Sequence, residues 1–356
     1  MKRFKEVIAV AMCVLLSINI IACGSHDKKN SSSVGGLSNT KSSSKVSDKE
    51  LPIEVKGENY PLTVKDYLKD ETVIKTKPEK VAVLSGTPLN IWYDLGGKSV
   101  CTSDVSENIK LVEEHRDEIK NLPKIGPVYS IDMEGVIKMK PDLIIAQVGT
   151  QSKEAKKLRE MGFNVVSTHI RGYNDVLATY RAFGKILGVE DKAEERIKKL
   201  EESKNQMVSK LPKEKKSAVI LYVTSKSLAV KLDNSIAGDV ARILNIDNIS
   251  SGLAPDTIGS ESAPIDIEYI VGKNPDYVIV TSMISSNKKA KETMEEQFKN
   301  NPAWKGVKAI SDGRVIYLPQ EYFLYNAGPY YDEAIEYMAR GIYPDVYGKL
   351  EEWYGK

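Results

Sequence analysis

Residues 131–145, IDMEGVIKMKPDLII, recur as residues 265–279, IDIEYIVGKNPDYVI, and this repeat decides the fold. Matched positions are always 134 residues apart, as 265 − 131 and 279 − 145 show. A match at one constant offset is typical of a duplicated structural unit. Each copy predicts a short helix, a Pro-Asp turn and a buried strand. The sequence therefore predicts two similar lobes, because the offset is too long for a solenoid repeat.

Each copy of the repeat carries an acid at the same place, Glu134 in the first and Glu268 in the second. One matched acid per lobe indicates contact with a partner of two-fold symmetry. Each acid also falls at the start of a predicted helix, where it would complement the helix dipole. Both roles can hold at once.

The N-terminus has the pattern of an exported lipoprotein. A basic start, Met1 to Lys5, precedes an apolar stretch over 7–21 that is too short for a membrane span and fits a secretory signal. The signal, residues 1–22, ends before Cys23, where an aliphatic-small-Cys order predicts lipidation. Residues 23–55 predict a flexible tether, rich in Ser, Lys, Gly and Asn up to residue 50.

Composition excludes several classes of protein. The 356 residues are 41% hydrophobic and 28% charged, as in ordinary globular proteins, and the net charge of +2 gives no reason to expect nucleic acid. Of three Cys residues only Cys101 remains after Cys13 leaves with the signal and Cys23 takes a lipid. No internal disulfide is expected. Lys-rich usage and the short tether favour a Gram-positive cell surface.

Strand and helix patterns alternate along the rest of the chain, which predicts α/β lobes with mostly parallel sheets. Short strands are expected at 81–84, 99–102, 143–146 and 164–167. A helix without Gly or Pro follows within 189–212 and connects the two repeats. The expected division is an N-terminal lobe over 56–188, this linker helix, and a C-terminal lobe with a closing helix over 213–356.

Several segments in this order resemble the substrate-binding lipoproteins of ABC importers for iron–siderophore, haem and cobalamin. They include the Cys23 motif, Gly126-Pro127, Lys140-Pro141-Asp142 and the stretch 301–316. The resemblance covers roughly residues 62–338. It implies two Rossmann-like lobes bridged by one long α-helix, with the ligand cleft between them. It also implies that Glu134 and Glu268 dock to an ABC permease, which works with its ATPase.

Motifs for catalysis and for bare-metal binding are weak or missing in the sequence. It has no Gly-x-Ser-x-Gly, His-Glu-x-x-His or Walker loop, and Cys101 is expected to be buried rather than nucleophilic. Only three His residues occur, so a zinc or manganese site is not expected. His169 follows a predicted strand and could face the cleft or be structural. No cofactor, resident metal or enzymatic activity is predicted.

The ligand-binding candidates come from the rule that ligands bind at the carboxyl ends of strands in α/β sheets. In the first lobe they are Ser85, Thr87, Asn90, Gln147, Thr150, Arg171 and Tyr173. In the second lobe they are Tyr222, Lys226, Ser282, Tyr322 and Tyr325. Arg171 is expected to neutralise an anionic chelate, and Tyr322 and Tyr325 to stack on the ligand or coordinate ferric iron.

The sequence therefore predicts a lipid-anchored protein on the outer face of the cell membrane. It would capture a ferric-siderophore or related small-molecule iron chelate and deliver it to the permease. A cobalamin, other corrinoid or haem ligand is the alternative within the class. A surface enzyme acting on a small metabolite is the alternative from another class.

Lipidation requires the thiol of Cys23, so Cys23→Ser should release the protein from the membrane fraction or leave it unprocessed. Fractionation and the mass of the N-terminal peptide measure this. A correctly processed Cys23→Ser protein that stays in the detergent-extractable membrane fraction would contradict the assignment.

Overall fold

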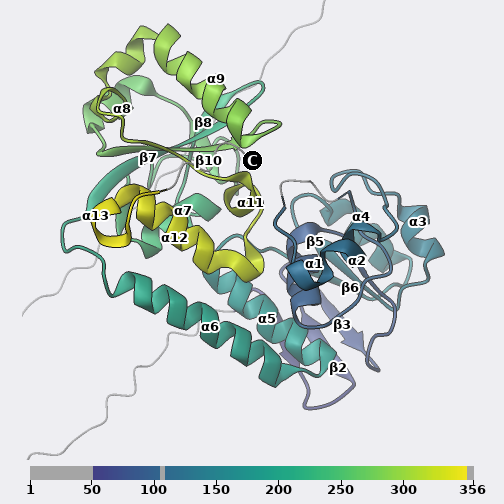
Figure 1. Cartoon of the computed structure of the whole chain (residues 1–356). Coiled ribbons are helices and arrows are strands. Elements are labelled where there is room, and N and C mark those ends of the chain that lie inside the picture. Colours follow the sequence, from purple (N-terminus) through teal and green to yellow (C-terminus); the bar gives the residue numbers. More distant parts are fainter. Residues whose placement is uncertain (1–50, 105–108, 351–356) are drawn as a thin grey trace, which may run out of the picture. The chain divides into compact units, whose positions relative to one another are not determined.

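The computed structural model describes residues 51–104 and 109–350. The chain divides by its contacts into Met1–Lys49 and Glu50–Lys356, and all described residues belong to the second unit. The predicted signal and the lipidation residue Cys23 lie outside the described residues. The fold is α/β, with two Rossmann-like lobes (Figure 1).

The N-terminal lobe is built on a parallel sheet in the order β4-β5-β6. A separate antiparallel sheet, β1-β2-β3, precedes it in sequence. The strands are β1 (Glu54–Lys56), β2 (Leu62–Lys65), β3 (Glu71–Ile74), β4 (Val81–Val83), β5 (Leu143–Gln147) and β6 (Val165–Thr168). The helices are α1 (Gly86–Asp94), η1 (Glu113–His115), α2 (Arg116–Lys120), α3 (Met133–Lys138), α4 (Ser152–Glu160) and α5 (Tyr173–Leu187).

The strand expected at 99–102 is wrong. Only Thr102 forms an isolated bridge, to Lys124. The Ser99 hydroxyl takes the place of a strand beside β4: it accepts a hydrogen bond from Val83 N at 2.9 Å and lies 3.2 Å from the Val81 carbonyl. A serine side chain that bonds neighbouring backbone groups competes in this way with a regular ladder.

The C-terminal lobe has a mixed sheet in the order β10-β8-β7-β11-β12, with β9 also paired to β7. Its strands are β7 (Lys216–Thr224), β8 (Leu228–Lys231), β9 (Ile246–Asn248), β10 (Ser262–Pro264), β11 (Tyr277–Met283) and β12 (Val315–Tyr317). Its helices are α7 (Ile236–Ile243), α8 (Ile267–Lys273), α9 (Asn287–Asn300), η2 (Pro302–Gly306), α10 (Lys308–Ser311), α11 (Gln320–Phe323), η3 (Gly328–Tyr330), α12 (Tyr331–Ile342) and α13 (Pro344–Tyr347).

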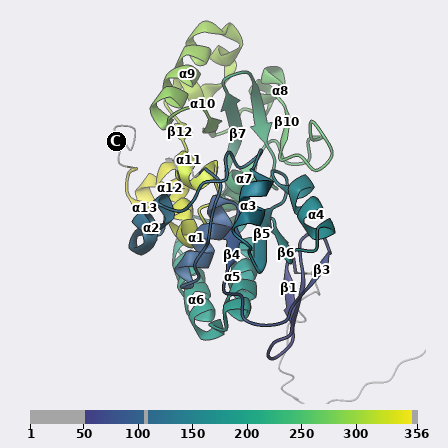
Figure 2. The same cartoon turned by 90° about the vertical axis from the view of Figure 1, so that its right-hand side faces the viewer.

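The long helix α6 (Glu190–Val208) carries the chain from one lobe to the other. Gly188 ends α5 with a φ of 67°, a left-handed conformation that suits glycine, and the chain turns back so that α6 packs along α5 (Figures 1 and 2). Helix α6 also packs on α12. No helix of the described residues is both long and apolar enough to cross a membrane.

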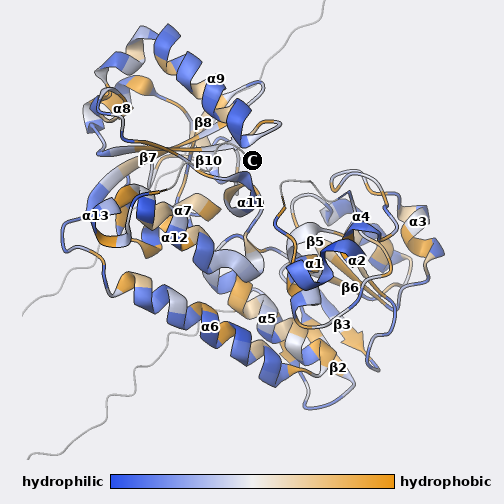
Figure 3. Ribbon diagram, in the orientation of Figure 1, coloured by the Kyte–Doolittle hydropathy of each residue, from blue (hydrophilic) through white to orange (hydrophobic). Residues whose placement is uncertain are grey.

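The β4-β5-β6 sheet and the mixed C-terminal sheet each have two apolar faces, and only one face of each is shared between the lobes. Val81, Val83 and Ile145 of the first sheet belong to the same buried cluster as Ala218 and Ile220 of the second. We call this the shared core, and it includes residues of α1, α5, α6, α7 and α12. Strands that are buried on both faces have continuous apolar sequences. Figure 3 shows the strands of these two sheets as mainly hydrophobic.

The alternate strand residues face two smaller clusters, one in each lobe. Ala82 and Ile144 lie in a cluster with Val136 of α3, which we call the N-terminal outer core. Val219 and Val278 lie in a cluster with Ile270 of α8, which we call the C-terminal outer core. The period of two along each strand therefore assigns its side chains to the shared core or to an outer core.

The repeat folds the same way twice. Asp132 and Asp266 cap α3 and α8 by accepting a hydrogen bond from a backbone N–H three residues later, both at 3.0 Å. After the helices, Lys140 and Asn274 adopt left-handed conformations with φ of 52° and 46°. The sequence match thus extends to the caps and turns of both copies.

The Asp of each Pro-Asp turn braces the start of the lobe's first parallel strand. Asp142 accepts hydrogen bonds from Glu79 N at 2.8 Å and Lys80 N at 3.1 Å, ahead of β4. Asp276 accepts from Ser217 N at 2.8 Å and from the Ser217 hydroxyl at 2.9 Å, at the start of β7. These bonds join β4 to β5 and β7 to β11 outside the strand ladders.

Asp276→Ala should lower the free energy of unfolding by about 1–3 kcal/mol, because the Ser217 amide loses its charged partner. Asp247→Ala is the matched control, since the Asp247 carboxylate makes only an exposed ion pair with Lys215 at 3.3 Å, worth about 0–1 kcal/mol. Urea unfolding measures both. Equal losses for the two variants would show that the Asp276 brace does not stabilise the lobe.

Candidate functional site

A cavity of about 420 Å³ lies between the two lobes, and we call it the interlobe cavity. The first lobe lines it with the segments that follow β4, β5 and β6. The second lobe contributes Ile236 at the start of α7, Met283 at the end of β11, and the segment after α11. Ligands of α/β proteins bind at such carboxyl strand ends.

A buried glutamine holds two of the cavity-lining strand ends in place. Gln151 donates from Nε2 to the Leu84 carbonyl at 2.7 Å and accepts from Gln147 N at 2.9 Å. It therefore ties the end of β4 to the end of β5. Next to it, the Ile109 side chain packs on Gly86, where a Cβ would come within 2.5 Å of the Ile109 Cδ1 and would displace it.

Arg171 connects the lobes at the cavity wall. Its backbone N donates to Asp175 at 3.0 Å, and its carbonyl accepts from Asn326 Nδ2 at 3.1 Å. Its Nε lies 3.5 Å from the Glu261 carboxylate of the second lobe. The Glu261 carboxylate therefore partly neutralises the guanidinium charge from the other side of the cavity.

His169 stands beside Arg171 as a neutral imidazole. Its Nε2 accepts a hydrogen bond from the Arg171 Nε, and its ring packs against Tyr67 with centroids 4.5 Å apart and the planes tilted by 44°. Burial, and then the Arg171 charge, lower its pKa from 6.5 to about 4. The Nε2 lone pair is used by Arg171, so in this arrangement that nitrogen is not available to a metal.

Exposed apolar and aromatic side chains face the cavity from both lobes. Tyr129 is 69% exposed and Met283 is 55% exposed, which is unusual for such large side chains. Tyr325 and Leu324 add further contact area from the second lobe. A ligand could cover these surfaces and gain hydrophobic stabilisation.

Six of the predicted ligand-binding residues line the interlobe cavity, and six do not. The six that line it are Ser85, Thr87, Gln147, Thr150, Arg171 and Tyr325. Their placement at the cavity supports a ligand role. The other six are used by the fold or lie elsewhere.

Asn90, Tyr173 and Ser282 are buried structural residues. Asn90 bonds the Lys110 carbonyl at 2.6 Å and Val112 N at 2.9 Å, which fixes the loop after residue 109. Tyr173 packs edge-on against Tyr331 at 5.6 Å. Ser282 accepts from Gln320 Nε2 at 3.0 Å. All three are buried, and none of them lines the interlobe cavity.

Tyr322, Tyr222 and Lys226 are also outside the cavity lining. The Tyr322 hydroxyl donates to Glu333, and burial together with that carboxylate raises its pKa well above the ordinary range, so it is not placed as a ferric ligand. The Tyr222 hydroxyl donates to the Met283 sulfur at 3.3 Å. Lys226 lies in the exposed turn between β7 and β8.

Sequence reasoning missed Tyr129, Met283, Glu261 and Asp104. Met283 is adjacent to the predicted Ser282, and alternation along β11 sends one side chain inward and the other to the cavity. Glu261 precedes the antiparallel strand β10, so the rule for carboxyl ends of parallel strands could not find it. Tyr129 lies between α2 and α3 and follows no strand, so the rule for strand ends could not find it either.

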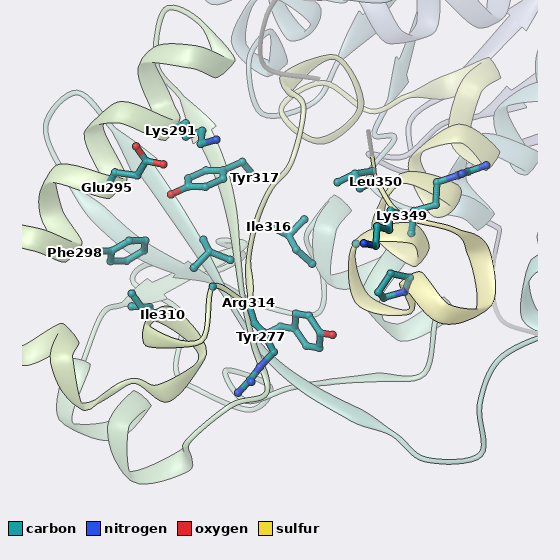
Figure 4. Close-up of a pocket in the computed structure, with 15 residues that line it drawn as sticks. Tyr277, Lys291, Glu295, Phe298, Ile310, Arg314, Ile316, Tyr317, Lys349 and Leu350 are labelled. Atoms are coloured by element: carbon teal, nitrogen blue, oxygen red, sulfur yellow. The ribbon is translucent and has the colours of Figure 1, made fainter. Parts of the chain in front are cut away.

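A second cavity, of about 730 Å³, lies beside the edge strand β12 (Figure 4). Tyr277, Phe298, Ile316 and Tyr317 form much of its apolar lining, and Leu350 closes one side. Its described lining residues all belong to the C-terminal lobe. It therefore does not lie between the carboxyl ends of β5 and β11, the strands of the two repeat copies. The interlobe cavity is the better candidate site for this reason.

Among residues 51–104 and 109–350 there is no cluster of three or more His, Cys, Asp or Glu that could hold a metal ion. Cys101 is buried, and burial raises the pKa of its thiol to about 11. A thiol in that state is a poor nucleophile.

The two repeat acids are exposed on matching helices. Glu134 and Glu268 are each the second residue of their helix, α3 and α8. Neither forms an ion pair with a described residue. Both carboxylates are therefore free to meet a partner.

Two sheets, a connecting helix and a cavity at facing strand ends define a two-lobed ligand-capture protein. A family profile for "Periplasmic binding protein" matches residues 81–322, which is more than half of the chain. The chain belongs to this family.

Similar proteins come from several bacteria. "Uncharacterized ABC transporter substrate-binding lipoprotein YvrC" of Bacillus subtilis is 24% identical over 309 residues, covering 84% of this chain and 91% of that protein. "Fe(3+)-citrate-binding protein YfmC" of the same organism is 22% identical, covering 88% and 90%. The crystal structure of Staphylococcus aureus IsdE complexed with heme matches with a TM-score of 0.63 and 20% identity, covering 74% of this chain and 98% of that one.

The depressed pKa of His169 predicts a pH dependence of stability. Between its ordinary pKa of 6.5 and its folded pKa of about 4, the unfolded chain binds more protons than the folded one. The free energy of unfolding should therefore fall as the pH is lowered through this window. His169→Gln lacks this titration, so the advantage of wild type over the variant should shrink from pH 7 to pH 4.

Urea unfolding of both proteins at each pH measures this difference. The carboxylates that titrate in the same range contribute equally to both free energies of unfolding, so their contribution cancels in the difference. A wild-type advantage that is constant or grows toward pH 4 would show that His169 is not held neutral.

Proposed function

We propose that this protein is the lipid-anchored binding component of an ABC importer, which captures a ferric chelate and delivers it to the permease. The observation that carries the proposal is the interlobe cavity, which both copies of a duplicated unit line at the carboxyl ends of their strands, β5 and β11. A cavity of about 420 Å³ falls in the range of small-molecule sites, about 300–1,000 Å³.

The names of similar proteins support iron as the cargo. One relative is named for Fe(3+)-citrate and one structural neighbour was solved with heme. The exposed Tyr129, Met283 and Tyr325 suit a bulky ligand with an organic shell, since they offer apolar and aromatic surface rather than a set of metal ligands. The chelate would be released from the protein chemically unchanged, as expected of a binding protein and not of an enzyme.

The shared core supports a cavity that is largely formed before the ligand binds. Strand residues of both lobes, Ile145 and Ile220 among them, are buried in one apolar cluster with α5 and α6. Wide opening of the lobes would expose part of this cluster to water and is costly for that reason. A preformed cavity suits a rigid chelate.

We assign the contact with the permease to Glu134 and Glu268. Each is exposed at the second position of its helix, and each helix is capped by an Asp that already satisfies a first-turn amide. Neither acid is needed for its own cap, so both are available to basic groups on a pair of related permease subunits. Cys23 would hold the protein at the outer face of the membrane, close to that permease.

Replacing both acids in Glu134→Ala/Glu268→Ala should abolish uptake of a ferric chelate and leave its binding unchanged, because the acids lie on α3 and α8, away from the cavity lining. Breaking one desolvated charge pair costs about 2–5 kcal/mol, so the double variant should lose more uptake than either single variant. Uptake of radiolabelled iron in cells measures the first effect.

Quenching of intrinsic fluorescence by ferric siderophores, haem and cyanocobalamin measures the second. Asp117→Ala/Glu296→Ala is the matched control, with one exposed helical acid per lobe outside α3 and α8. Normal uptake by the Glu134/Glu268 double variant would remove the docking assignment. Failure of every ferric chelate to bind at micromolar concentration, or its chemical conversion on binding, would overturn the proposed function.

A further inference from the structure

The interlobe cavity contains few full positive charges. Of the described residues that line it, Arg171 is the one Lys or Arg, and Asp104 and Glu261 are the carboxylates. His169 is a neutral acceptor of the Arg171 hydrogen bond. The formal charge of the lining is therefore +1 − 2, or −1.

The charge of Arg171 is shared with a protein carboxylate. Glu261 lies 3.5 Å from Arg171 and 3.7 Å from Lys231. The Lys231 ammonium is itself over the Tyr222 ring, at 4.2 Å from the centroid, outside the lining. These three groups together contribute +1, and they are already paired with one another.

Asp104 offsets that remaining charge from the opposite lobe. Its carboxylate is exposed at the cavity, and its charge interacts with that of Lys124, which lies outside the lining and donates to the Ile119 carbonyl at 2.9 Å. The lining itself, with Lys231 and Lys124 outside it, therefore presents a formal charge of −1 to a ligand. A carboxylate that faces the cavity repels anions and attracts cations.

The other polar contacts on offer are partial charges. Helix α1 begins at the cavity with Ser85 as its N-cap and without a side-chain cap. Its first-turn amides can therefore donate hydrogen bonds to a ligand oxygen, whether that oxygen is neutral or charged. Around them are Tyr129, Met283 and Tyr325. This combination suits a ligand with carbonyl or hydroxamate oxygens and an apolar backbone.

We propose that the interlobe cavity selects a ferric chelate of zero or single positive charge, the trihydroxamate class, and rejects polyanionic carboxylate and catecholate chelates. This inference rests on the proposed function and narrows its ligand. Three hydroxamates, each a monoanion, balance ferric iron and leave no net charge. Three catecholates, each a dianion, leave a charge of −3, and haem carries two propionates.

The physical reason is the desolvation of charge. A polyanion that enters the cavity loses water and finds one guanidinium, whose charge Glu261 partly neutralises. Burying charge without a free partner costs more than the contacts return. A neutral or cationic chelate avoids this cost, and a cation gains from Asp104.

The test is a panel of four probes titrated into the full-length protein in detergent at low ionic strength. They are ferrichrome (neutral), ferrioxamine B (cationic), ferric citrate (anionic) and ferric enterobactin (trianionic). We expect the first two to bind at least tenfold more tightly than the last two. The difference should narrow at high salt, which screens charge but not apolar contact.

Two variants remove one cavity carboxylate each, Glu261→Gln in the second lobe and Asp104→Asn in the first. Each should improve binding of the anionic probes by about fivefold to tenfold relative to ferrichrome, because one repulsive or competing charge is gone. Asp247→Asn is the control, with the same change of charge in β9, outside the cavity lining. It should leave the order and spacing of the four affinities unchanged.

Anionic chelates that bind as tightly as ferrichrome would overturn this inference and leave the proposed function intact. The same holds if Glu261→Gln and Asp104→Asn shift the affinities no more than Asp247→Asn does. Failure of all four probes to bind would overturn the proposed function, and the inference with it.

Discussion

The carboxylate of Asp239 is the contact on which the arrangement of the lobes depends. It lies on α7, and its Oδ2 accepts hydrogen bonds at 2.8 Å from Tyr173 N, at the start of α5, and from the Tyr331 hydroxyl, at the start of α12. A Cβ on Gly172 would come within 3.0 Å of this carboxylate. One acid from the second lobe thus complements the dipole of the helix that ends the first lobe.

Around that contact the two lobes share one apolar cluster, so the cavity between them is bounded by packed elements. Arg171 stands one residue before Gly172, and its guanidinium reaches Glu261 from this fixed backbone position. The features that hold the lobes together therefore also determine which charges a ligand meets. The same contacts therefore set both the shape of the interlobe cavity and the charges on its wall.

The sequence predicted the duplicated unit and the linker helix well, because caps, Pro-Asp turns and apolar runs are local signals. It predicted the site less well. Asn90 and Tyr322 were expected in the cleft but bond to protein groups, Lys110 and Glu333. Glu261 and Asp104 were missed because their positions depend on how two lobes meet. Side-chain direction at a strand end, as at Ser282 and Met283, needs the register that only the folded sheet gives.

The division into one shared core and two outer cores implies that stability is unevenly distributed. Helices α3 and α8, with Glu134 and Glu268, are anchored through Val136 and Ile270 in the smaller outer clusters. Segments with fewer buried contacts open at lower free energy than the segments they cover. Amide hydrogen exchange would then be faster in α3 and α8 than in α5. Such fluctuations would alter the surface that carries Glu134 and Glu268 while the walls of the interlobe cavity stay closed.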